Sequence, residues 1–365
     1  MSDMRRITIL FGSLSMLLMS SCNQGTDTRG TVVVDAKAYL IRENVDLNCS
    51  PSSAKELLLS GNLGDDTNYY FCDKNILYKY DVTNNDMSMF YYGNNSDYIA
   101  TGKTNGIWVI HPTRKGICNF NDGNTYFCYD SIPYIGMDFR LVNRRQMPII
   151  GNTVYCSLLG IVDEFDKMPK IAKWRIADNK LIFDTLFGDF PISYDYGNFA
   201  LGHMSEFIYN SNDSIIILSS GLMDTISLYD KGGKFLKNVY FGSSFKKPIK
   251  KLSLEGLQEQ STSIQWQRQN NYYCRLIYDP WREVYIRTFY RPSENKTDGI
   301  IRDDNGSYVL IIADKAFRIK NEVIFENPDY RAGFFVLPMP EGVFILKQKN
   351  LYDNEKMQID LFLFD

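Results

Sequence analysis

A strand followed by a turn is clearest at Thr225-Ile-Ser-Leu-Tyr-Asp230, where apolar residues alternate with polar ones and an aspartate follows. The same design recurs at Ile76-Leu-Tyr-Lys-Tyr-Asp81 and at Val309-Leu-Ile-Ile-Ala-Asp314. A period of two is typical of a strand, and aspartate favours turns because its side chain bonds the backbone ahead of it. Three widely spaced copies of one unit predict an architecture of repeated small sheets.

Outward from these units, short strands and tight turns continue through most of the chain. Grouped in fours, the strands predict blades near residues 52–92, 98–140, 147–188, 200–242, 271–327 and 330–365. The expected fold is therefore an all-β propeller with six blades, while seven blades and a pair of β-sandwiches remain as alternatives. The last blade supplies three strands, so Thr31–Leu40 is predicted to complete it and close the ring. A helix is expected over Ser253–Gln267, inside an insertion near residues 243–270.

The composition agrees with a large β domain. Among 365 residues, aromatic residues reach 14%, with 25 Tyr and 23 Phe, and these residue types favour strands. A hydrophobic fraction of 44% excludes extensive disorder. The net charge of −3 and pI near 5.6 predict no nucleic-acid partner.

The N-terminus has the pattern of an export signal. Arg5-Arg6 precede an apolar stretch, Ile7–Met19, that is too short to span a bilayer core of about 30 Å. Small residues then lead directly to a cysteine in Met19-Ser-Ser-Cys22, which resembles the lipobox of bacterial lipoproteins; the alternative is an ordinary signal peptide beside a structural cysteine. We therefore expect residues 1–21 to be a signal peptide and Cys22 to carry lipid.

This interpretation divides the chain into a signal, a lipidated tether at residues 22–30 and one propeller domain at residues 31–365. Asn23 follows the cysteine, whereas an aspartate there favours retention in the inner membrane of enteric bacteria. The predicted location is the outer membrane, attached through lipid on Cys22, and either periplasmic or surface-facing.

The segment Ile277-Tyr-Asp-Pro-Trp-Arg-Glu-Val-Tyr-Ile-Arg287, together with the lipobox and the propeller rhythm, resembles the uncharacterised TolB-like six-bladed propeller lipoproteins of Bacteroidetes. Trp281 and Ile286 stand where that group carries tyrosine. The resemblance spans nearly the whole chain after the signal, although only the hairpin and the lipobox are specific. It implies a fold and a location, and no activity.

Candidate functional residues are few. Trp281 and Arg282 are candidate binding residues, although Asp279 and Pro280 also favour a purely structural turn. His111 and His203 lie in no nucleophile motif, and no zinc, calcium or nucleotide motif occurs, so we predict no catalytic residue, metal or cofactor. An acidic cluster, Asp163-Glu-Phe-Asp166, and a basic run, Phe245–Lys251, are interpreted as solvated loops.

The predicted function is a binding or scaffold module for a protein or a glycan. One alternative is a carbohydrate hydrolase or lyase that uses carboxylates at the mouth of the channel, and another is a structural accessory of the envelope without a small ligand. The sequence does not favour an enzyme.

Six cysteines follow Cys22, and one pair can be judged from spacing. Cys118 and Cys128 flank the hairpin turn Asn121–Asn124. A two-residue loop at Asp122-Gly123 sets residue 118 opposite 127 and prevents a disulfide, while a three-residue loop sets residue 118 opposite 128 and permits one. We expect the two-residue loop and free thiols.

Overall fold

The computed structural model describes residues 148–159, 169–178, 180–189, 205–210, 212–249, 252–253, 255–256, 259–292, 306–325, 336–346 and 358–364. Before residue 142 it describes the backbone of the strands named below and the turn at residues 83–84. The signal, the tether and Cys22 lie outside the described residues, as do His203 and the acidic cluster at residues 163–166.

The described strands form five sheets. The first contains β3 (Asn62–Leu63), β4 (Asn68–Asp73), β5 (Ile76–Asp81) and β6 (Asp86–Tyr91). A nine-stranded sheet contains β7 (Tyr98–Gly102), β8 (Gly106–His111), β9 (Gly116–Asn119), β10 (Tyr126–Tyr129), β11 (Arg140–Leu141), β12 (Ile149–Ile150), β13 (Thr153–Leu159), β14 (Ile171–Ala177) and β15 (Lys180–Phe187).

In each of the remaining three sheets, strands that follow one another in the chain pair antiparallel. One contains β16 (Ser205–Asn210), β17 (Ile215–Ser220), β18 (Thr225–Asp230) and β19 (Phe235–Tyr240). The next contains β20 (Tyr272–Asp279), β21 (Val284–Arg291), β22 (Ser307–Ala313) and β23 (Ile319–Phe325), with β1 (Val33–Val34) at its edge. The last contains β24 (Val336–Met339), β25 (Gly342–Leu346), β26 (Gln358–Phe364) and β2 (Ala38–Asp46).

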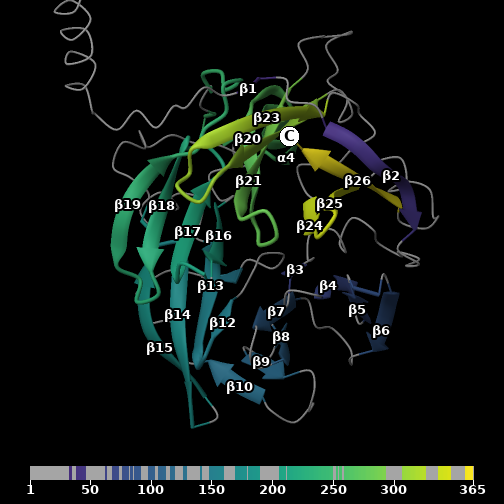
Figure 1. The fold of residues 1–365 in the computed structure, drawn as a ribbon. Helices are drawn as coiled ribbons and strands as arrows, with labels where there is room; N and C mark the ends of the chain where they lie inside the picture. Colours follow the sequence, from purple (N-terminus) through teal and green to yellow (C-terminus); the bar gives the residue numbers. More distant parts are fainter. Residues whose placement is uncertain are drawn as a thin grey trace, which may run out of the picture.

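The sheets follow one another around a ring in chain order (Figure 1). Inner strands of successive sheets contact one another, since β16 lies against β13 and β20, and β20 lies against β24. Among the described strands of the nine-stranded sheet, the antiparallel groups β7–β10 and β12–β15 are connected by the parallel pairing of β10 with β15. The all-β propeller predicted from the sequence is confirmed.

The repeated aspartate occupies one position in three sheets. Asp81, Asp230 and Asp314 each stand at or directly after the end of the third strand. In each turn the aspartate Oδ1 accepts two backbone N–H groups. Asp81 accepts those of Thr83 and Asn84 at 2.8 and 3.2 Å. Asp230 accepts those of Gly232 and Lys234 at 2.8 and 2.9 Å, and Asp314 accepts those of Ala316 and Arg318 at 2.9 and 3.0 Å. The repeat seen in the sequence is therefore a real structural repeat, because in each sheet the aspartate binds backbone N–H groups two and either three or four residues ahead and so turns the chain into the fourth strand.

The core lies between neighbouring sheets. Strands β17, β21 and β22 are buried along almost their whole length, since a sheet inside the ring is covered on both faces. One apolar cluster joins β16–β19 to β20–β23, and Tyr285 stacks there on Phe317 with 4.4 Å between ring centroids. A second cluster joins β20–β23 to β24–β26.

The N-terminal segment closes the ring, with boundaries that differ from those predicted. β2 pairs antiparallel with β26, from Ala38 opposite Phe364 to Asp46 opposite Gln358. β1 instead pairs in parallel with β23, so that Val33 lies opposite Asn321. The single strand predicted over Thr31–Leu40 is thus two strands in two sheets. The sequence did not show this division, because the partners of each half lie about 290 to 325 residues away.

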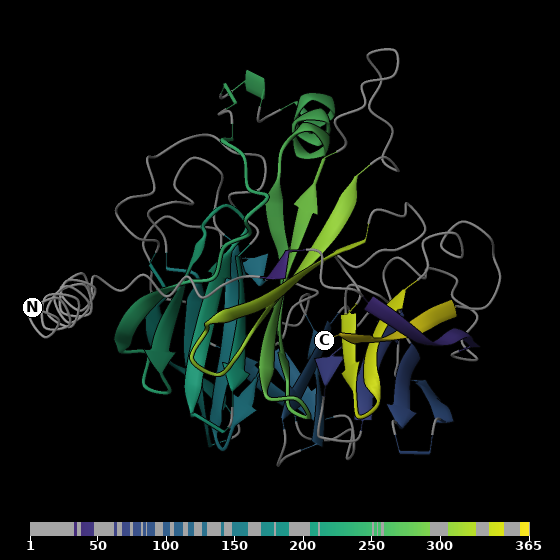
Figure 2. The same cartoon turned by 45° about the horizontal axis from the view of Figure 1, so that its top comes forward.

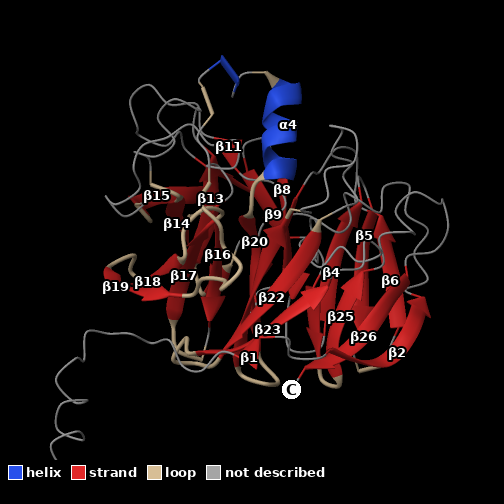
Figure 3. Cartoon of the chain, turned by 90° about the horizontal axis from the view of Figure 1, so that it is seen from above, coloured by secondary structure: helices blue, strands red, loops and turns tan. Residues whose placement is uncertain are grey.

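The helix α4 spans Gln260–Gln269 and begins later than the predicted Ser253. Its N-cap is Glu259, whose extended backbone ends the preceding segment and whose carboxylate accepts the hydroxyl groups of Ser261 and Thr262. Trp266 is buried and joins the core cluster beside β20. The helix stands beyond the strand ends on one side of the ring (Figures 2 and 3).

The predicted register of the cysteine hairpin is wrong. Cys118 lies opposite Tyr126 and Cys128 lies opposite Gly116, so neither the two-residue nor the three-residue loop describes the turn. The two cysteines are separated by two positions along the ladder and are not cross-strand partners. Cys156 and Cys274 are both buried and free, as expected.

Candidate functional site

The two ends of the strands differ in the length of the connections that leave them. The first strand of each sheet starts on the side that carries α4, so the connections from fourth to first strands and from second to third strands lie there. We call this side the loop face; the longer connections whose flanking strands end and begin there are residues 47–61, 160–170, 188–204, 241–271, 292–306, 326–335 and 347–357.

The opposite side, which we call the turn face, contains the hairpins between first and second strands and between third and fourth strands. Its connections between described strands are short, and the longest, residues 120–125, has six residues. Short turns fix strand pairing, whereas long connections on a rigid ring are where binding residues are usually carried. The loop face is therefore the candidate binding surface.

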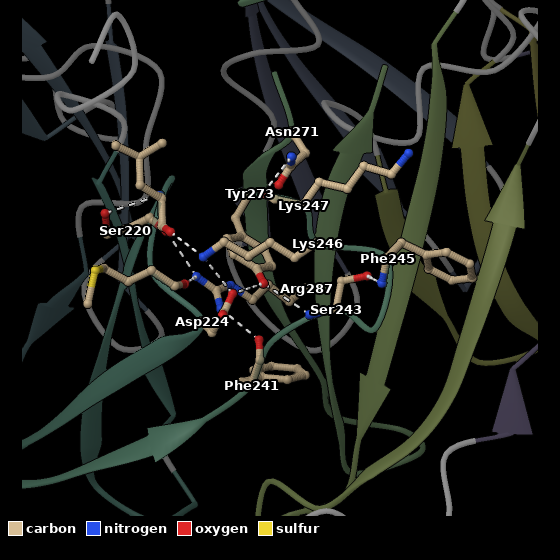
Figure 4. A network of polar contacts seen from close by, with 12 residues as sticks. Ser220, Asp224, Phe241, Ser243, Phe245, Lys246, Lys247, Asn271, Tyr273 and Arg287 are labelled. Atoms are coloured by element: carbon tan, nitrogen blue, oxygen red, sulfur yellow. Dashed lines mark hydrogen bonds and ion pairs between the residues drawn. The ribbon is translucent and has the colours of Figure 1, made fainter. Parts of the chain in front are cut away.

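A polar cluster lies at the loop-face end of the boundary between sheets β16–β19 and β20–β23 (Figure 4). We call it the seam cluster, and its members are Asp224, Ser243, Lys246, Tyr273, Arg287 and Glu322. They come from β20, β21, β23 and the connections after β17 and β19.

Arg287 is the centre of this cluster and is 0% exposed. Its Nη2 donates to the carbonyl oxygens of Ser220 at 2.9 Å and Met223 at 2.7 Å, and its Nη1 donates to that of Phe241 at 2.6 Å. Nε donates to Ser219 Oγ at 3.1 Å. The guanidinium therefore holds the connection between β17 and β18 and the start of the connection after β19.

Tyr273 links the arginine to a pair of charges nearer the surface. The guanidinium carbon of Arg287 lies 3.5 Å from the centroid of the Tyr273 ring, a cation–π contact. The Tyr273 hydroxyl donates to Asp224 Oδ1 at 2.6 Å and accepts the backbone N–H of Ser243 at 3.0 Å. Lys246 Nζ lies 2.8 Å from the same Asp224 oxygen and donates to the Leu222 carbonyl.

Glu322 completes the cluster from the neighbouring strand β23. Its two carboxylate oxygens accept Ser243 Oγ and the backbone N–H of Ser244, each at 2.8 Å. Burial raises the pKa of Glu322, and these hydrogen bonds oppose that rise. The contact holds the first residues of the 241–271 connection against the outer part of the sheet.

The ionisation of the cluster is set by burial. Burial lowers the pKa of Arg287 to about 10, so the side chain stays charged at neutral pH. Burial also raises the pKa of Tyr273, which keeps its proton and its role as donor to Asp224. Because these groups bind one another and the backbone, the arrangement positions the loop face; it is not a set of side chains poised for reaction.

The sequence contains one signal for this cluster, a charged residue within an apolar and aromatic strand. Arg287 stands in the middle of the strand Val-Tyr-Ile-Arg-Thr-Phe-Tyr, where it and its neighbours on both sides are buried. A charge in such a position requires several hydrogen-bond partners. Those partners lie 46 to 68 residues away and could not be named from the sequence.

The candidate binding residues Trp281 and Arg282 lie on the turn face, opposite the seam cluster. The Arg282 side chain binds the Asp279 carboxylate at 2.6 Å and donates to the carbonyl oxygens of Met339 at 2.8 Å and Gly342 at 2.6 Å. It thereby joins two adjacent sheets through their hairpins. Trp281 is half-buried, and its backbone N–H donates to Asp279 Oδ1.

Other sequence candidates contribute little to a site. The basic run starts within the seam cluster, where Lys246 is held by Asp224. Four carboxylates are buried among the described residues, those of Glu206, Asp279, Glu322 and Asp360. Donors hold the first three: Glu206 is bound by the Leu276 N–H and the Arg275 ion pair, Asp279 by Arg282, and Glu322 by Ser243 and Ser244. Among the described residues, no cluster of three or more His, Cys, Asp or Glu could hold a metal.

In the described part of the chain, α4 is too short and too polar to cross a membrane, and no other helix there can do so. The location of the protein therefore stays a prediction from the N-terminal signal.

The architecture places the chain in the class of β-propellers. No family model and no curated protein matches it. Among solved structures, it is similar to a member of the DUF4221 family from Bacteroides vulgatus, with a TM-score of 0.62 and 13% identity over 91% of this chain and 99% of that one. At this identity the likeness concerns the fold alone.

Two further structures are more distant. The β-propeller domain of Cps50 (Swd1) from Myceliophthora thermophila has a TM-score of 0.44 and 6% identity, over 89% of this chain and 99% of that one. The calcium-binding protein regucalcin from Agrobacterium tumefaciens has a TM-score of 0.43 and 8% identity, over 91% of this chain and 95% of that one.

Proposed function

We propose that the chain is a binding or scaffold module of the bacterial cell envelope, anchored to the outer membrane by lipid on Cys22. In this proposal the ring has six blades, and a protein or glycan binds to its loop face. The observation that carries the proposal is the unequal length of the connections on the two faces. A rigid ring with long connections on one side is suited to presenting a broad recognition surface.

The seam cluster supports this function through position. Arg287 and Tyr273 fix the connection after β17 and the start of the connection after β19, which leads to α4. Fixing a loop before binding reduces the entropy lost when a partner is bound. The hydrolase alternative is less favoured, because Glu206, Asp279 and Glu322, three of the four buried acids among the described residues, are engaged as structural acceptors.

The binding face can be tested by capture from envelope extracts with paired variants. Gln265 and Gln269 are exposed on α4, and Lys231 and Lys315 are exposed on the turn face. The double variant Gln265→Arg/Gln269→Arg should lose a partner that the parent chain retains, whereas Lys231→Glu/Lys315→Glu should keep it. Loss of the partner only in the turn-face variant would contradict the proposal.

The anchor is tested separately. Cys22→Ala should move the protein from the membrane fraction to the soluble fraction, because two or three acyl chains anchor firmly and the rest of the chain supplies no comparable apolar segment after the signal is removed. Unchanged partitioning of this variant would show that Cys22 is not the site of attachment.

A further inference from the structure

Two residues of opposite charge meet at the inner edge of the ring, in the half of the strands nearer the loop face. Glu206 is the second residue of β16 and Arg275 is the fourth residue of β20, and both strands start on the loop face. β20 is the terminal strand of its sheet and contacts β16 and β24, the first strands of the two neighbouring sheets. We call Glu206 and Arg275 the inner pair.

A β-bulge in β20 sets the position of Arg275. The pairing of β20 with β21 shifts between Tyr273 and Leu276, so Cys274 and Arg275 together oppose the single residue Thr288. The Arg275 backbone N–H donates to the Thr288 hydroxyl at 2.9 Å instead of to a carbonyl oxygen of the ladder. Bulges re-aim side chains and are over-represented beside functional sites. Here the bulge breaks the regular alternation of β20 at its one arginine.

The inner pair is incompletely bonded. Glu206 Oε2 accepts the Leu276 N–H at 2.7 Å, whereas Oε1 lies 3.0 Å from Arg275 Nε. Oε1 and Nε are both buried, and neither makes an aligned hydrogen bond within the described part of the chain. No described residue accepts from Nη1 or Nη2 of Arg275 either. A buried charge is costly unless it is fully hydrogen-bonded, so this pair lacks partners that its chemistry requires.

Other buried oxygen atoms without a hydrogen-bond partner among the described residues lie toward the same face. Ser157 Oγ is two residues before the loop-face end of β13, and Asn271 Oδ1 directly precedes β20. Both residues are buried. Buried polar groups of this kind are normally completed by a polar solute. The loop-face side is therefore where the fold leaves polar groups to be satisfied from outside the protein.

The inner pair can be reached at the arginine. The Arg275 side chain is 13% exposed and that of Glu206 is 3% exposed. Because Nε belongs to the buried part, a solute meets the guanidinium at its Nη end. A molecule bound there would have Glu206 Oε1 beside it as an acceptor.

The opposite charges of the inner pair select the kind of ligand. An anion would meet the Glu206 carboxylate, and a cation would meet the Arg275 guanidinium. A neutral sugar avoids both conflicts, because each hydroxyl group can donate and accept. Of two hydroxyl groups on adjacent carbons, one can donate to Glu206 Oε1 while the other accepts from an Arg275 Nη.

We infer that the inner pair is a binding site for a neutral carbohydrate with hydroxyl groups on adjacent carbons. The inference rests on the loop-face binding in the proposed function and deepens it, since it selects a glycan over a protein as the ligand. Glu206 and Arg275 act as an acceptor and a donor in this site, and the bulge holds the donor in place.

A glycan array tests the site with the full mature chain. We expect the parent chain to bind at least one neutral polysaccharide, and periodate treatment of that glycan to abolish binding, because periodate cleaves between carbons that carry adjacent hydroxyl groups. Arg275→Met should weaken binding about tenfold or more, since hydrogen bonds from a charged donor are lost. Arg318→Met is the matched control, because Arg318 is 62% exposed on the turn face, and it should bind as the parent does.

Three results of the array would overturn the inference. They are a parent chain that binds no glycan, binding that survives periodate, and equal binding by Arg275→Met and the parent. Capture of an envelope protein through α4, in a chain that binds no glycan, would refute the carbohydrate site and leave the proposed function standing.

Arg275→Met also leaves Glu206 buried without its counter-ion, so a second measurement uses the unaltered chain. Phenylglyoxal modifies the guanidinium groups of arginine, and mass spectrometry of peptides gives the rate at each site. The bound polysaccharide should slow modification of Arg275 several-fold and leave the rate at Arg318 unchanged. If Arg275 reacts equally fast with and without the glycan, or does not react in its absence, the inner pair is not the binding site.

Discussion

At the scale of single residues, a few charged side chains hold together segments that are distant in sequence. Arg287 binds three carbonyl oxygens and one hydroxyl from the neighbouring sheet and its connections, while Arg282 binds a hairpin of the sheet on the other side. Both lie between sheets, where apolar packing alone does not fix how the connections run. Their removal should therefore affect stability more than the removal of an exposed charge.

Arg287→Met should lower the free energy of unfolding by about 3–5 kcal/mol, because it leaves buried carbonyl oxygens without a donor. Arg318→Met is the matched control: Arg318 is 62% exposed in its ion pair with Asp314, and its loss should cost at most about 1 kcal/mol. Urea denaturation of both variants checks this. Equal losses would mean that the Arg287 network adds nothing beyond a surface ion pair.

Arg282→Ala should destabilise the protein more at pH 8 than at pH 5. Burial already raises the pKa of Asp279, and Arg282 is the main group that opposes the rise. Without the arginine the folded-state pKa rises further above the unfolded value, so the stability present in acid is lost as pH increases through the folded-state pKa. Melting temperatures across this range measure the effect.

Trp281→Ala is the control for that hairpin, since Trp281 is half-buried and its backbone bond to Asp279 survives the change. It should show no comparable dependence on pH. A pH-independent loss of stability in Arg282→Ala would instead indicate that only the contacts with Met339 and Gly342 were important.

Cys156 and Cys274 should resist alkylation in the native protein. Both thiols are buried, and burial raises the pKa of each, so the reactive thiolate is scarce as well as inaccessible. Mass spectrometry of peptides after iodoacetamide treatment should find both unmodified until denaturant is added. Rapid native labelling of either one would show that its strand opens locally.

At the scale of secondary-structure elements, the aspartate turn defines the outer hairpin of the repeated sheets. Asp230→Ala removes the acceptor of the Gly232 and Lys234 N–H groups in an exposed turn. We expect a loss of about 0.5–1.5 kcal/mol and faster hydrogen exchange of these two amides. Asp230→Asn keeps an acceptor oxygen and should lose less; equal losses would indicate that the charge matters more than the bond.

At the scale of the whole molecule, the ring depends on a strand from the N-terminal part of the chain. Deleting residues 31–37 removes β1 and should change the melting temperature little, since β1 pairs with β23 at only two positions. Deleting residues 31–46 also removes β2 and exposes the edge of β26, so this chain should aggregate or melt well below the first. Similar melting temperatures for the two deletions would show that β2 does not close the ring.

The sequence by itself determined the features that depend on neighbouring residues. Strands β5 and β18 were predicted at the residues where they are found, and the aspartates after third strands form the expected turns, because alternation and side-chain-to-backbone bonds within four residues are local. The strand groups of the propeller followed from the repetition of these local units.

Tertiary structure alone decided the contacts between distant segments. The division of residues 31–46 between two sheets, the parallel pair of β10 and β15, and the partners of Arg287 all join residues about 50 to 325 positions apart. Such pairings depend on which edges and carbonyl groups the assembled ring leaves open. For the same reason the sequence indicated Trp281 and Arg282 as binding residues, while the structure draws attention to the opposite face, where the long connections and the seam cluster lie.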